Sequence, residues 1–447
     1  MFKKILVANR ATAARRIIRA LRLLGVSSVA VYSDADESLP FVCEADSAYP
    51  LGPSRPAESY LNQDRIISIA KQAGCDGIHP GYGFLSENGS FAQAVAAAGL
   101  SFIGPSSKLI TLMGNKRSAR AEMERHGMPV AESSGLLGSD TEAALAAARA
   151  LGFPLMIKPS AGGGGIGMLS ANDESGFIAA LAKARTISQR SFANAELFLE
   201  KLVERARHVE LQIMADSHGN VCHLFERDCS VQRRHQKIVE EARAPGIPAE
   251  EIAAISKRVI SCLEAIGYDN IGTVEMLYSS RTGFTFLEVN TRLQVEHAVT
   301  EAVTGIDIVT SQIRLAAHER LAEVVPPEVR DRGHAIEARI YAEDPVSFLP
   351  SPGVLTAFRL PDSSGVRIEA GYRAGNAVTH FYDPMLAKVI AHAPTRDESI
   401  SLLCGALSRC EIAGVKTNIP FIRSLLASKA FEAAKVHTRM VDEHDFA

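Results

Sequence analysis

The sequence predicts an α/β region at the N-terminus, followed by an α+β region that begins near residue 204. From residue 5 to about residue 98, apolar segments typical of strands alternate with helical segments. After residue 204, segments in which apolar and polar residues alternate with a period of two dominate instead. Because 447 residues exceed what one core usually holds, we expect two or three domains.

The N-terminal elements follow one another in βαβ order. Strands are expected near 5–8, 28–32 and 77–78, and helices near 13–24, 63–73, 91–98 and 108–126. This order predicts an open parallel sheet, whose binding crevices lie at the carboxyl ends of its strands. From about residue 141 to residue 200 the chain is rich in alanine and helical, interrupted by a strand at 154–157 and a run of glycines.

Composition excludes several classes of protein. The 48 basic and 51 acidic residues leave a net charge of −3, so no global basic field favours nucleic acid. The longest apolar runs, such as 94–100, are too short to cross a bilayer, and the N-terminus enters a strand without a signal peptide. The seven cysteines lack metal-binding spacing, and their odd number indicates reduced thiols in a cytoplasmic protein.

A run of glycines at 162–165 follows the strand that ends in Lys158. Adjacent glycines let successive backbone N–H groups approach an anion, and the lysine can reach the same phosphates. The run is not a Walker A loop, because no Gly-Lys-Ser/Thr sequence follows it. Taken alone, it fits a flexible linker equally well.

The clearest site pattern lies on two predicted strands that flank a turn at 280–283. A hairpin centred on the middle of this turn places Glu275 directly opposite Glu288, with Cβ atoms about 5 Å apart. Asn290 lies on the same face as Glu288. Two carboxylates and an amide oxygen suit one or two hard cations, and Mg²⁺ carrying nucleotide phosphates is the expected ion.

The alternation continues past this hairpin. One face carries Leu287, Val289, Leu293 and Val295, which are expected to face a core. The opposite face carries Glu288, Asn290, Arg292, Gln294 and Glu296. A solvated sheet face is the simplest alternative, but five polar functional groups in one row exceed what solubility requires. We therefore expect a functional site along this row.

Two further segments carry polar side chains in less specific patterns. His208, Glu210 and Gln212 share one face of a predicted strand, which is typical of an ordinary amphipathic edge strand. The segment 226–237 carries four cations and fits either a solvated loop or an anion pocket. Its Cys229 has no histidine at a fixed spacing, so we interpret it as an incidental thiol rather than a nucleophile.

The sequence resembles the biotin carboxylase component of biotin-dependent carboxylases nearly from end to end. The motifs include HPGYGFLSEN (79–88), MGNK (113–116), Lys158 with its glycine loop, EVNTRLQVEH (288–297) and EARIYAEDP (337–345). Their number and order make the resemblance specific. It implies an ATP-grasp fold with an N-terminal domain at 1–114, a small mobile lid region at 115–203 and a C-terminal domain at 204–447.

The resemblance also implies a role for each matching residue. For ATP, the matching residues are Lys116, Lys158, Gly164, Gly165, Glu200, Lys201, Val203, His208, Gln232 and His235. For Mg²⁺ or Mn²⁺, they are Glu275, Glu288 and Asn290, the set that the hairpin register reached independently. For bicarbonate, they are Lys237, Arg292, Gln294 and Val295, and for biotin, Arg339 with Tyr82 nearby. The implied catalytic residues are Lys237, Arg292, Glu296 and Arg339, with Glu296 as the general base.

The sequence departs from the family pattern at several positions. Ala11 and Thr12 replace the usual Gly-Glu, Ile166 and Leu169 replace basic residues of the lid, and Arg243 and Ala298 replace prolines. The glycine loop resembles that of urea carboxylases, which makes this branch an alternative. The lost lid cations bear on ATP affinity or on the rate of lid closure, not on the type of reaction.

The implied activity is that of an ATP-dependent ligase that carboxylates biotin through carboxyphosphate, as a subunit of an acyl-CoA carboxylase. No Ala-Met-Lys-Met-type biotinylation site or carboxyltransferase region is found, so we expect biotin on a separate carrier protein. Its partners are expected to be biotin carboxyl carrier protein and carboxyltransferase subunits. A homodimer is expected from a partial match, since Arg19 is kept while Leu23 and Ser364 differ.

Two rival interpretations remain: a different ATP-grasp ligase, or a nucleotide-binding regulatory protein that has lost catalysis. The row from Arg292 to Glu296 together with Arg339 disfavours the first. The unusual lid and N-terminal residues slightly favour the second, but the intact metal and bicarbonate rows disfavour it strongly.

Overall fold

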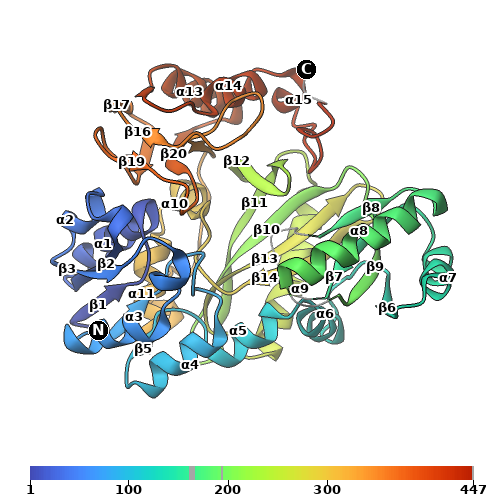
Figure 1. The fold of residues 1–447 in the computed structure, drawn as a ribbon, viewed down its shortest axis with the longest axis horizontal. Coiled ribbons are helices and arrows are strands. Elements are labelled where there is room, and N and C mark those ends of the chain that lie inside the picture. The colour runs from blue at the N-terminus through green and yellow to red at the C-terminus, as the bar shows by residue number, and fades with distance from the viewer. Residues whose placement is uncertain (161–166, 193–194, 445–447) are drawn as a thin grey trace.

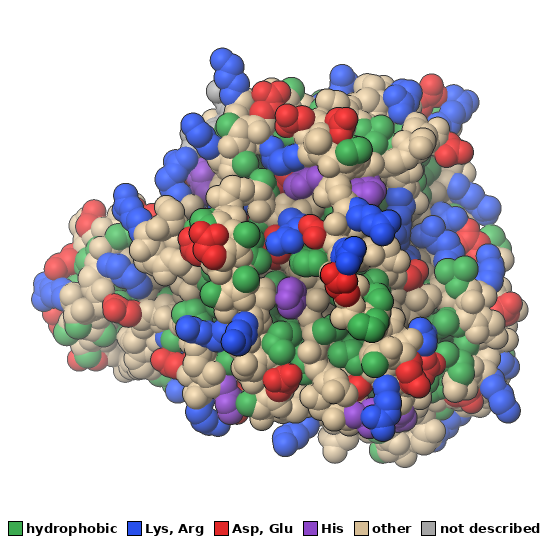
Figure 2. All heavy atoms as spheres, turned by 180° about the vertical axis from the view of Figure 1, so that it is seen from behind, with side chains coloured by type: hydrophobic (Ala, Val, Ile, Leu, Met, Phe, Trp, Pro, Cys, Tyr) green, Lys and Arg blue, Asp and Glu red, His purple; other side chains and the backbone are tan. Residues whose placement is uncertain are grey.

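The computed structural model describes residues 1–160, 167–192 and 195–444. Figure 1 shows the N-terminal sheet (blue) beside a large central sheet (green and yellow), with a small sheet and its helices at the opposite side and the C-terminal elements (orange and red) at the top. Among the described residues, none of the helices has the length and hydrophobicity that crossing a bilayer requires. Basic and acidic side chains are interspersed over the back of the molecule (Figure 2), in line with the net charge of −3.

The N-terminal unit is an open parallel sheet, as the sequence predicts. Its strands are β1 (Lys4–Val7), β2 (Ser27–Ser33), β3 (Ser47–Gly52), β4 (Gly77–His79) and β5 (Ser101–Phe102), in the order β3-β2-β1-β4-β5. The helices α1 (Ala11–Leu23), α2 (Pro40–Glu44), α3 (Gln63–Gln72) and α4 (Gly89–Ala97) lie between these strands in the chain. Strand β3 was not predicted, because its sequence SAYPLG has no apolar alternation and contains proline.

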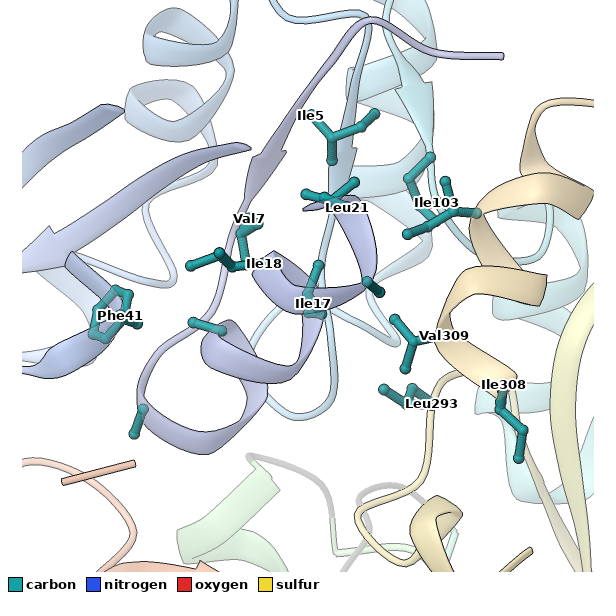
Figure 3. Close-up of a cluster of buried hydrophobic side chains, with 14 of the residues drawn as sticks. Ile5, Val7, Ile17, Ile18, Leu21, Phe41, Ile103, Leu293, Ile308 and Val309 are labelled. Atoms are coloured by element: carbon teal, nitrogen blue, oxygen red, sulfur yellow. The ribbon is translucent and has the colours of Figure 1, made fainter. Parts of the chain in front are cut away.

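An apolar cluster joins this unit to the second half of the chain (Figure 3). Ile17 and Leu21 of α1 are fully buried in it. The same cluster contains Leu293 and Val309, which are also fully buried. Burial of each such side chain contributes about 2 kcal/mol. Leu293 therefore anchors the segment 291–296, which carries much of the predicted polar row, in a rigid core.

The helix expected near 108–126 is interrupted. The structure has two helices there, α5 (Ser107–Gly114) and α6 (Lys116–Arg125). The backbone of Asn115 is extended, and its side-chain oxygen accepts a hydrogen bond from the Ser118 backbone N–H at 3.0 Å. An asparagine at this position satisfies a free N–H group of the first turn, which is why a new helix begins here. Lys116 therefore stands on the first turn of α6.

The middle region forms a small antiparallel sheet covered by two helices. Its elements are β6 (Ser133–Leu137), α7 (Thr141–Leu151), β7 (Leu155–Pro159), β8 (Leu169–Ala171), α8 (Glu174–Phe192) and β9 (Leu197–Lys201), with strand order β6-β9-β7-β8. Lys158 and Glu200 lie on the paired strands β7 and β9. Gly164 and Gly165, predicted to bind phosphate, lie outside the described residues.

The third region is built on an eight-stranded antiparallel sheet. Its strands, in spatial order, are β14 (Gly283–Asn290), β13 (Asn270–Ser279), β10 (Arg207–Ala215), β11 (Val221–Arg233), β12 (Gln236–Ala242), β15 (His334–Tyr341), β20 (Met385–Ala393) and β18 (Val366–Ala370). The helices of this region are α9 (Ala249–Ala265), α10 (His297–Thr304), α11 (Ile308–Ala316), α12 (Leu321–Val324), α13 (Arg396–Ser408), α14 (Ile419–Leu426) and α15 (Lys429–Glu432). Two short strand pairs complete it: β16 (Gly353–Val354) with β19 (Ala377–Val378), and β17 (Ala357–Arg359) with β21 (Glu411–Ala413).

The hairpin of β13 and β14 confirms the predicted pairing of Glu275 with Glu288, but by a different route. At its tip Ser279 pairs with Gly283, so the turn is centred on Arg281, half a residue before the predicted centre. A shift of register directly after Glu275 then restores the predicted pairing. An extra residue of this kind on one strand is a β-bulge, and here it offsets the misplaced turn.

Two of the less specific predictions are resolved in favour of a buried site. Strand β10 lies between β11 and β13, so its interpretation as an edge strand is wrong. Its polar residues His208, Glu210 and Gln212 are all buried. The segment 226–237 is not a solvated loop, because it forms the end of β11 and the start of β12, with Arg227 completely buried. Buried polar groups require partners, and the ion pairs described below supply them.

Candidate functional site

A cavity of about 580 Å³ lies between α6, the small sheet and the eight-stranded sheet. The predicted residues that line it are Lys116, Lys158, Glu200, Lys201, Val203, His208, Gln232, His235, Lys237, Glu275, Glu288, Asn290, Arg292, Gln294, Val295, Glu296 and Arg339. The fold thus brings together residues from the predicted lid region, 115–203, and from the predicted C-terminal domain, 204–447. Tyr82 is not among the lining residues.

The lysines on the side of the small sheet are held by carboxylates or carbonyls. Lys158 Nζ donates a hydrogen bond to Glu200 on the adjacent strand. Lys116 Nζ lies 3.4 Å from a carboxylate oxygen of Glu288, across the cavity. Lys201 differs, because its Nζ donates to two backbone carbonyls of the loop before β7, each at 3.1 Å. Lys116 and Lys158 are therefore paired with carboxylates that line the cavity, whereas the Lys201 ammonium is held by backbone carbonyls.

The turn between β11 and β12 places another imidazole at the cavity. Arg234 and His235 form this turn with positive φ angles of 50° and 65°. Two left-handed residues match the twist of a tight hairpin, although neither residue is a glycine or an asparagine. Burial lowers the pKa of His235 below its ordinary value, which leaves the imidazole neutral at physiological pH. On the adjacent strands, Gln232 Nε2 lies 2.9 Å from His208 Nδ1.

Lys237 is the centre of a buried cluster of charges. Its Nζ donates to Glu210 at 2.6 Å, to Glu275 at 2.8 Å and to Glu296 at 2.6 Å. Burial disfavours the charged lysine, but the three carboxylates outweigh burial and raise the pKa of Lys237 well above its ordinary value. Lys237 is therefore a fixed cation that holds three acidic side chains in place.

Arg227, which is fully buried, contacts this cluster through Glu210. Arg227 Nε donates to Glu210 at 2.6 Å, and its Nη1 donates to Gln212 at 2.8 Å and to Thr300 at 2.9 Å. Glu210 thus lies between Arg227 and Lys237. Because Glu210 contacts both cations, it helps to fix the position of the Lys237 ammonium.

Glu275, Glu288 and Asn290 present oxygen atoms on one wall of the cavity. Asn290 Nδ2 donates to Glu275 Oε1 at 2.8 Å, and His208 Nε2 lies 3.1 Å from Glu275 Oε2. Burial opposes ionisation of Glu275, but Lys237 and His208 hold its pKa well below the ordinary value. Ionised carboxylates and amide oxygens are the ligands that Mg²⁺ and Mn²⁺ prefer. The donor set therefore fits a hard divalent cation.

The predicted polar row is real, but only its first part is a strand. Strand β14 ends at Asn290, and Arg292 follows in an irregular segment. Arg292 Nε donates to Glu87 at 2.8 Å, and its Nη1 and Nη2 donate to Gln294 at 3.0 Å and to Asn290 at 3.2 Å. These three partners fix the position of the guanidinium beside the row. The partner Glu87 comes from the N-terminal domain region, so Arg292 links the two halves of the site.

The apolar residues of the row divide between core and cavity. Val289 and Leu293 are buried in apolar clusters, as expected. Leu287 and Val295, also expected in a core, instead line the cavity and are half-buried. The register shift in β14 and the end of the strand at Asn290 break the alternation on which the prediction depended.

Glu296 and Arg339 form the deepest part of the site. Glu296 is completely buried, with one oxygen on Lys237 and the other 3.0 Å from Arg339 Nη2. Burial opposes ionisation, but Lys237, Arg339 and Arg227 hold the pKa of Glu296 well below the ordinary value. Glu296 is therefore an ionised carboxylate that can accept a proton. Arg339 also lies 2.5 Å from Glu240 on the neighbouring strand.

Tyr82 lies behind this region rather than on the cavity wall. It packs half-buried against the N-terminal apolar cluster, and its hydroxyl is buried without a hydrogen-bond partner among the described residues. Burial raises the pKa of Tyr82 well above the ordinary value, and nearby Glu369 and Arg339 also act on it. Its predicted contact with biotin stays a prediction.

Several residues of the site were not predicted as such. Glu87, Tyr341, Asp383, Thr438 and Arg439 line the cavity, while Glu210, Arg227 and Glu240 support it. Glu87 and Tyr341 lie inside two of the motifs quoted above, so closer inspection of those motifs could have found them. Thr438 and Arg439 stand in no recognisable pattern, and only the tertiary fold brings them to the cavity.

Matches to known families cover most of the chain. The model described as "Biotin carboxylase, N-terminal domain" matches residues 1–110, and "Biotin carboxylase C-terminal domain" matches residues 337–443. Between them, "Carbamoyl-phosphate synthase L chain, ATP binding domain" matches residues 115–324. The ATP-binding match spans the small sheet and the strands that carry Lys237 and Glu288.

Individual proteins give the same result. The biotin carboxylase of Halalkalibacterium halodurans is 49% identical, over 99% of this chain and 98% of that protein. A pyruvate carboxylase subunit of Methanothermobacter thermautotrophicus is 44% identical, over 99% of this chain and 90% of that protein. Among solved structures, the biotin carboxylase domain dimer of Hydrogenobacter thermophilus 2-oxoglutarate carboxylase, in complex with MgADP, ADP and bicarbonate, is similar with a TM-score of 0.95. It is 41% identical, over 100% of this chain and 98% of that chain. The chain, with its ATP-grasp fold, belongs to the biotin carboxylase family.

Proposed function

We propose that this chain uses ATP and bicarbonate to carboxylate biotin on a separate carrier protein, through carboxyphosphate. The observation that carries the proposal is the position of Glu296, an ionised and buried carboxylate held between Lys237 and Arg339 at one end of the cavity. This end of the cavity thus offers a base and two fixed cations, and the other end offers Lys116 and Lys158 for phosphates. Such an arrangement suits a reaction in which ATP phosphorylates bicarbonate. The enzyme is on this proposal an ATP-dependent ligase.

We assign the end of the cavity near the small sheet to ATP. Lys116 and Lys158 neutralise the phosphates, and Glu200, Lys201 and Val203 meet the adenine. His208, Gln232 and His235 complete the contacts with the nucleotide. Gly164 and Gly165 are assigned to the phosphates on sequence alone. Glu275, Glu288 and Asn290 would hold Mg²⁺ or Mn²⁺, which lowers the charge on the transferring phosphoryl group.

Bicarbonate is assigned to Arg292, Gln294, Lys237 and the backbone at Val295. Glu296 accepts the proton of bicarbonate, and the oxygen that is set free attacks the γ-phosphorus of ATP. The bond from this phosphorus to the β-phosphate oxygen breaks, and ADP and carboxyphosphate form. Lys237 and Arg292 compensate the negative charge that two anions bring together.

Carboxyphosphate then separates into CO₂ and phosphate. The phosphate takes the proton from the ureido nitrogen of biotin, and this nitrogen attacks CO₂. Negative charge develops meanwhile on the ureido oxygen. Arg339 is placed to stabilise that charge, and we assign biotin to this side chain with Tyr82 nearby.

We propose that biotin carboxyl carrier protein and carboxyltransferase subunits are the partners, and that the complex is an acyl-CoA carboxylase. The mixture of names among similar proteins supports a family-level assignment, since pyruvate carboxylase subunits and 2-oxoglutarate carboxylase domains share this fold. A urea carboxylase-type complex is the alternative for the acceptor. We also propose a homodimer, supported by the dimer of the Hydrogenobacter domain and by Arg19, which matches the family's dimer residues.

The proposal is tested by measuring phosphate release from ATP in three mixtures: ATP alone, ATP with bicarbonate, and ATP with bicarbonate and free biotin. Phosphate release is expected only with bicarbonate, and it is expected to rise when free biotin is added. Equal release in bicarbonate-free buffer would instead indicate a different ATP-dependent enzyme. No release in any mixture would support a regulatory protein that binds the nucleotide without turnover.

A further inference from the structure

A second group of buried charges lies directly behind Arg339. Glu240 on β12 and Glu337 on β15 are direct cross-strand partners, and both are completely buried. None of their four carboxylate oxygens has a hydrogen-bond partner of normal geometry among the described residues. Ion pairs reach them instead: Arg339 Nη2 lies 2.5 Å from Glu240, and Lys388 Nζ lies 3.2 Å from Glu337.

Neither cation is available to this pair alone. Arg339 also contacts Glu296 at 3.0 Å, and Lys388 also contacts Glu369 at 3.0 Å. The charged groups that face the pair are Lys237 on β12, Arg339 on β15, Glu369 on β18, Lys388 on β20 and Glu296. Burial and, in addition, the charge of the pair raise the pKa values of three weak acids, Cys229 on β11, Tyr341 on β15 and Tyr82. Anions therefore outnumber the cations beside the pair if both of its members are ionised.

Glu240 and Glu337 are buried on directly paired positions, so ionising both carboxyl groups carries a large cost in free energy. Burial raises the pKa of Glu240 to about 7, with Glu296 adding to the effect, and burial together with the charge of Glu240 raises the pKa of Glu337 to about 8. The two groups titrate as a unit, so that near neutral pH they share a proton.

The same nitrogen of Arg339 contacts both Glu240 and Glu296. The charge on Glu240 therefore changes how much positive charge Arg339 can offer to a third group. With Glu240 ionised, two carboxylates neutralise the guanidinium. With Glu240 neutral, Glu296 supplies the counter-charge, and it loses that charge when it accepts the proton of bicarbonate.

We propose that Glu240 is a positioning residue for Arg339, and that Glu240 and Glu337 hold one proton between them so that Arg339 keeps its charge for the biotin oxygen. The inference rests on the proposed function, because it concerns the second half of that reaction. It also links the two halves, since protonation of Glu296 in the first half frees Arg339 for the second. The active form of the pair is the one that carries the proton.

The test is the pH profile of biotin carboxylation in Glu240→Gln. In the wild type, the rate falls as rising pH removes the shared proton, which gives an alkaline limb. Glutamine keeps the shape of a neutral Glu240 and cannot lose the proton. The alkaline limb is therefore expected to move upward by about one pH unit or more in the variant. The pH profile of bicarbonate-dependent ATP cleavage, measured on the same preparation, is expected to stay unchanged.

Glu241→Gln is the matched control. Glu241 is the next residue on β12 and is also buried, but it pairs with Arg396 at 2.7 Å and with His334 at 2.8 Å, away from Arg339. This control is expected to lower stability without moving the alkaline limb. If Glu240→Gln does not fold, Glu337→Gln tests the same pair with a downward shift of the alkaline limb, because Glu240 then ionises without an anion on its cross-strand partner.

An unchanged alkaline limb in the folded variant of the pair would overturn the inference. An equal shift in Glu241→Gln would also overturn it, because the effect would then come from general loosening of the sheet. Wild-type protein without any biotin-dependent activity would contradict the proposed function instead, so the two failures are distinguishable.

Discussion

Replacing Arg339 with serine removes the side chain that we assign to the biotin oxygen. Arg339 is 8% exposed, and its guanidinium contacts Glu240 and Glu296. An electrostatic group that meets charge only in the transition state contributes on the order of 3 kcal/mol, or about a hundredfold in rate. Because Lys237 still contacts Glu296 in the variant, Glu296 stays ionised and able to accept a proton. We therefore expect biotin carboxylation to fall about a hundredfold while bicarbonate-dependent ATP cleavage changes little.

The effect on folding has to be separated from the effect on chemistry. Breaking a buried ion pair costs about 3–5 kcal/mol when a charge is left behind, but Glu240 can take up a proton and reduce that cost. The alternative is that Arg339 merely forms ion pairs with neighbours such as Glu337 or Glu343. In the structure Glu343 contacts Arg233 and Glu337 contacts Lys388, while Arg339 contacts Glu240 and Glu296.

Arg233→Ser is accordingly a matched control, since it breaks a similarly buried pair outside the cavity wall. Both half-reactions are to be assayed on one preparation of each variant, together with the melting temperature. Equal losses of the two half-reactions in Arg339→Ser would refute the assignment.

Three further predictions follow from the site and the core. Glu288→Gln is expected to keep the fold and to lose turnover at limiting Mg²⁺, and wild-type activity there would contradict the assignment of the metal site. Lys237→Met leaves Glu210, Glu275 and Glu296 without their shared cation, so the rates of both half-reactions should fall by about a hundredfold or more. Rates in the variant equal to those of the wild type would show that Lys237 is only structural. For Glu369, burial opposes ionisation but Lys388 and Arg367 lower its pKa well below the ordinary value of 4.5. Its contribution to stability is full above that value and is lost as pH falls toward its folded pKa, so the stability difference between Glu369→Gln and the wild type should shrink in urea titrations below about pH 4.5.

Local patterns in the sequence were sufficient for the parallel sheet and for the metal-site pair. Ile5, Leu6 and Val7 form a short apolar run beside an amphipathic helix, and such runs determine their own partners in a βαβ unit. The pairing of Glu275 with Glu288 followed from the position of one turn. It survived an error in that turn because a bulge compensated, which no count of residues can reveal.

The supporting charges could not be predicted in the same way. Arg227 and Glu240 look like ordinary polar residues of solvated strands until β10, β11, β12 and β15 are placed side by side. Their burial depends on α10, which packs against β11, β12 and β15. Helix α6 was missed as a separate element for a local reason, since a capping asparagine interrupts a helical pattern without proline or glycine at that residue. The roles of individual residues remain predictions based on family resemblance and on this geometry.

The most direct measurement is the transfer of labelled bicarbonate to biotin by the purified wild-type protein. With ATP and Mg²⁺ present, we predict that the label appears in acid-labile carboxybiotin. The amount of this product should be proportional to the additional ADP that forms when biotin is added. Omission of either ATP or bicarbonate should abolish the product. Formation of ADP without label on biotin, or ADP formation that is independent of bicarbonate, would contradict the proposed function.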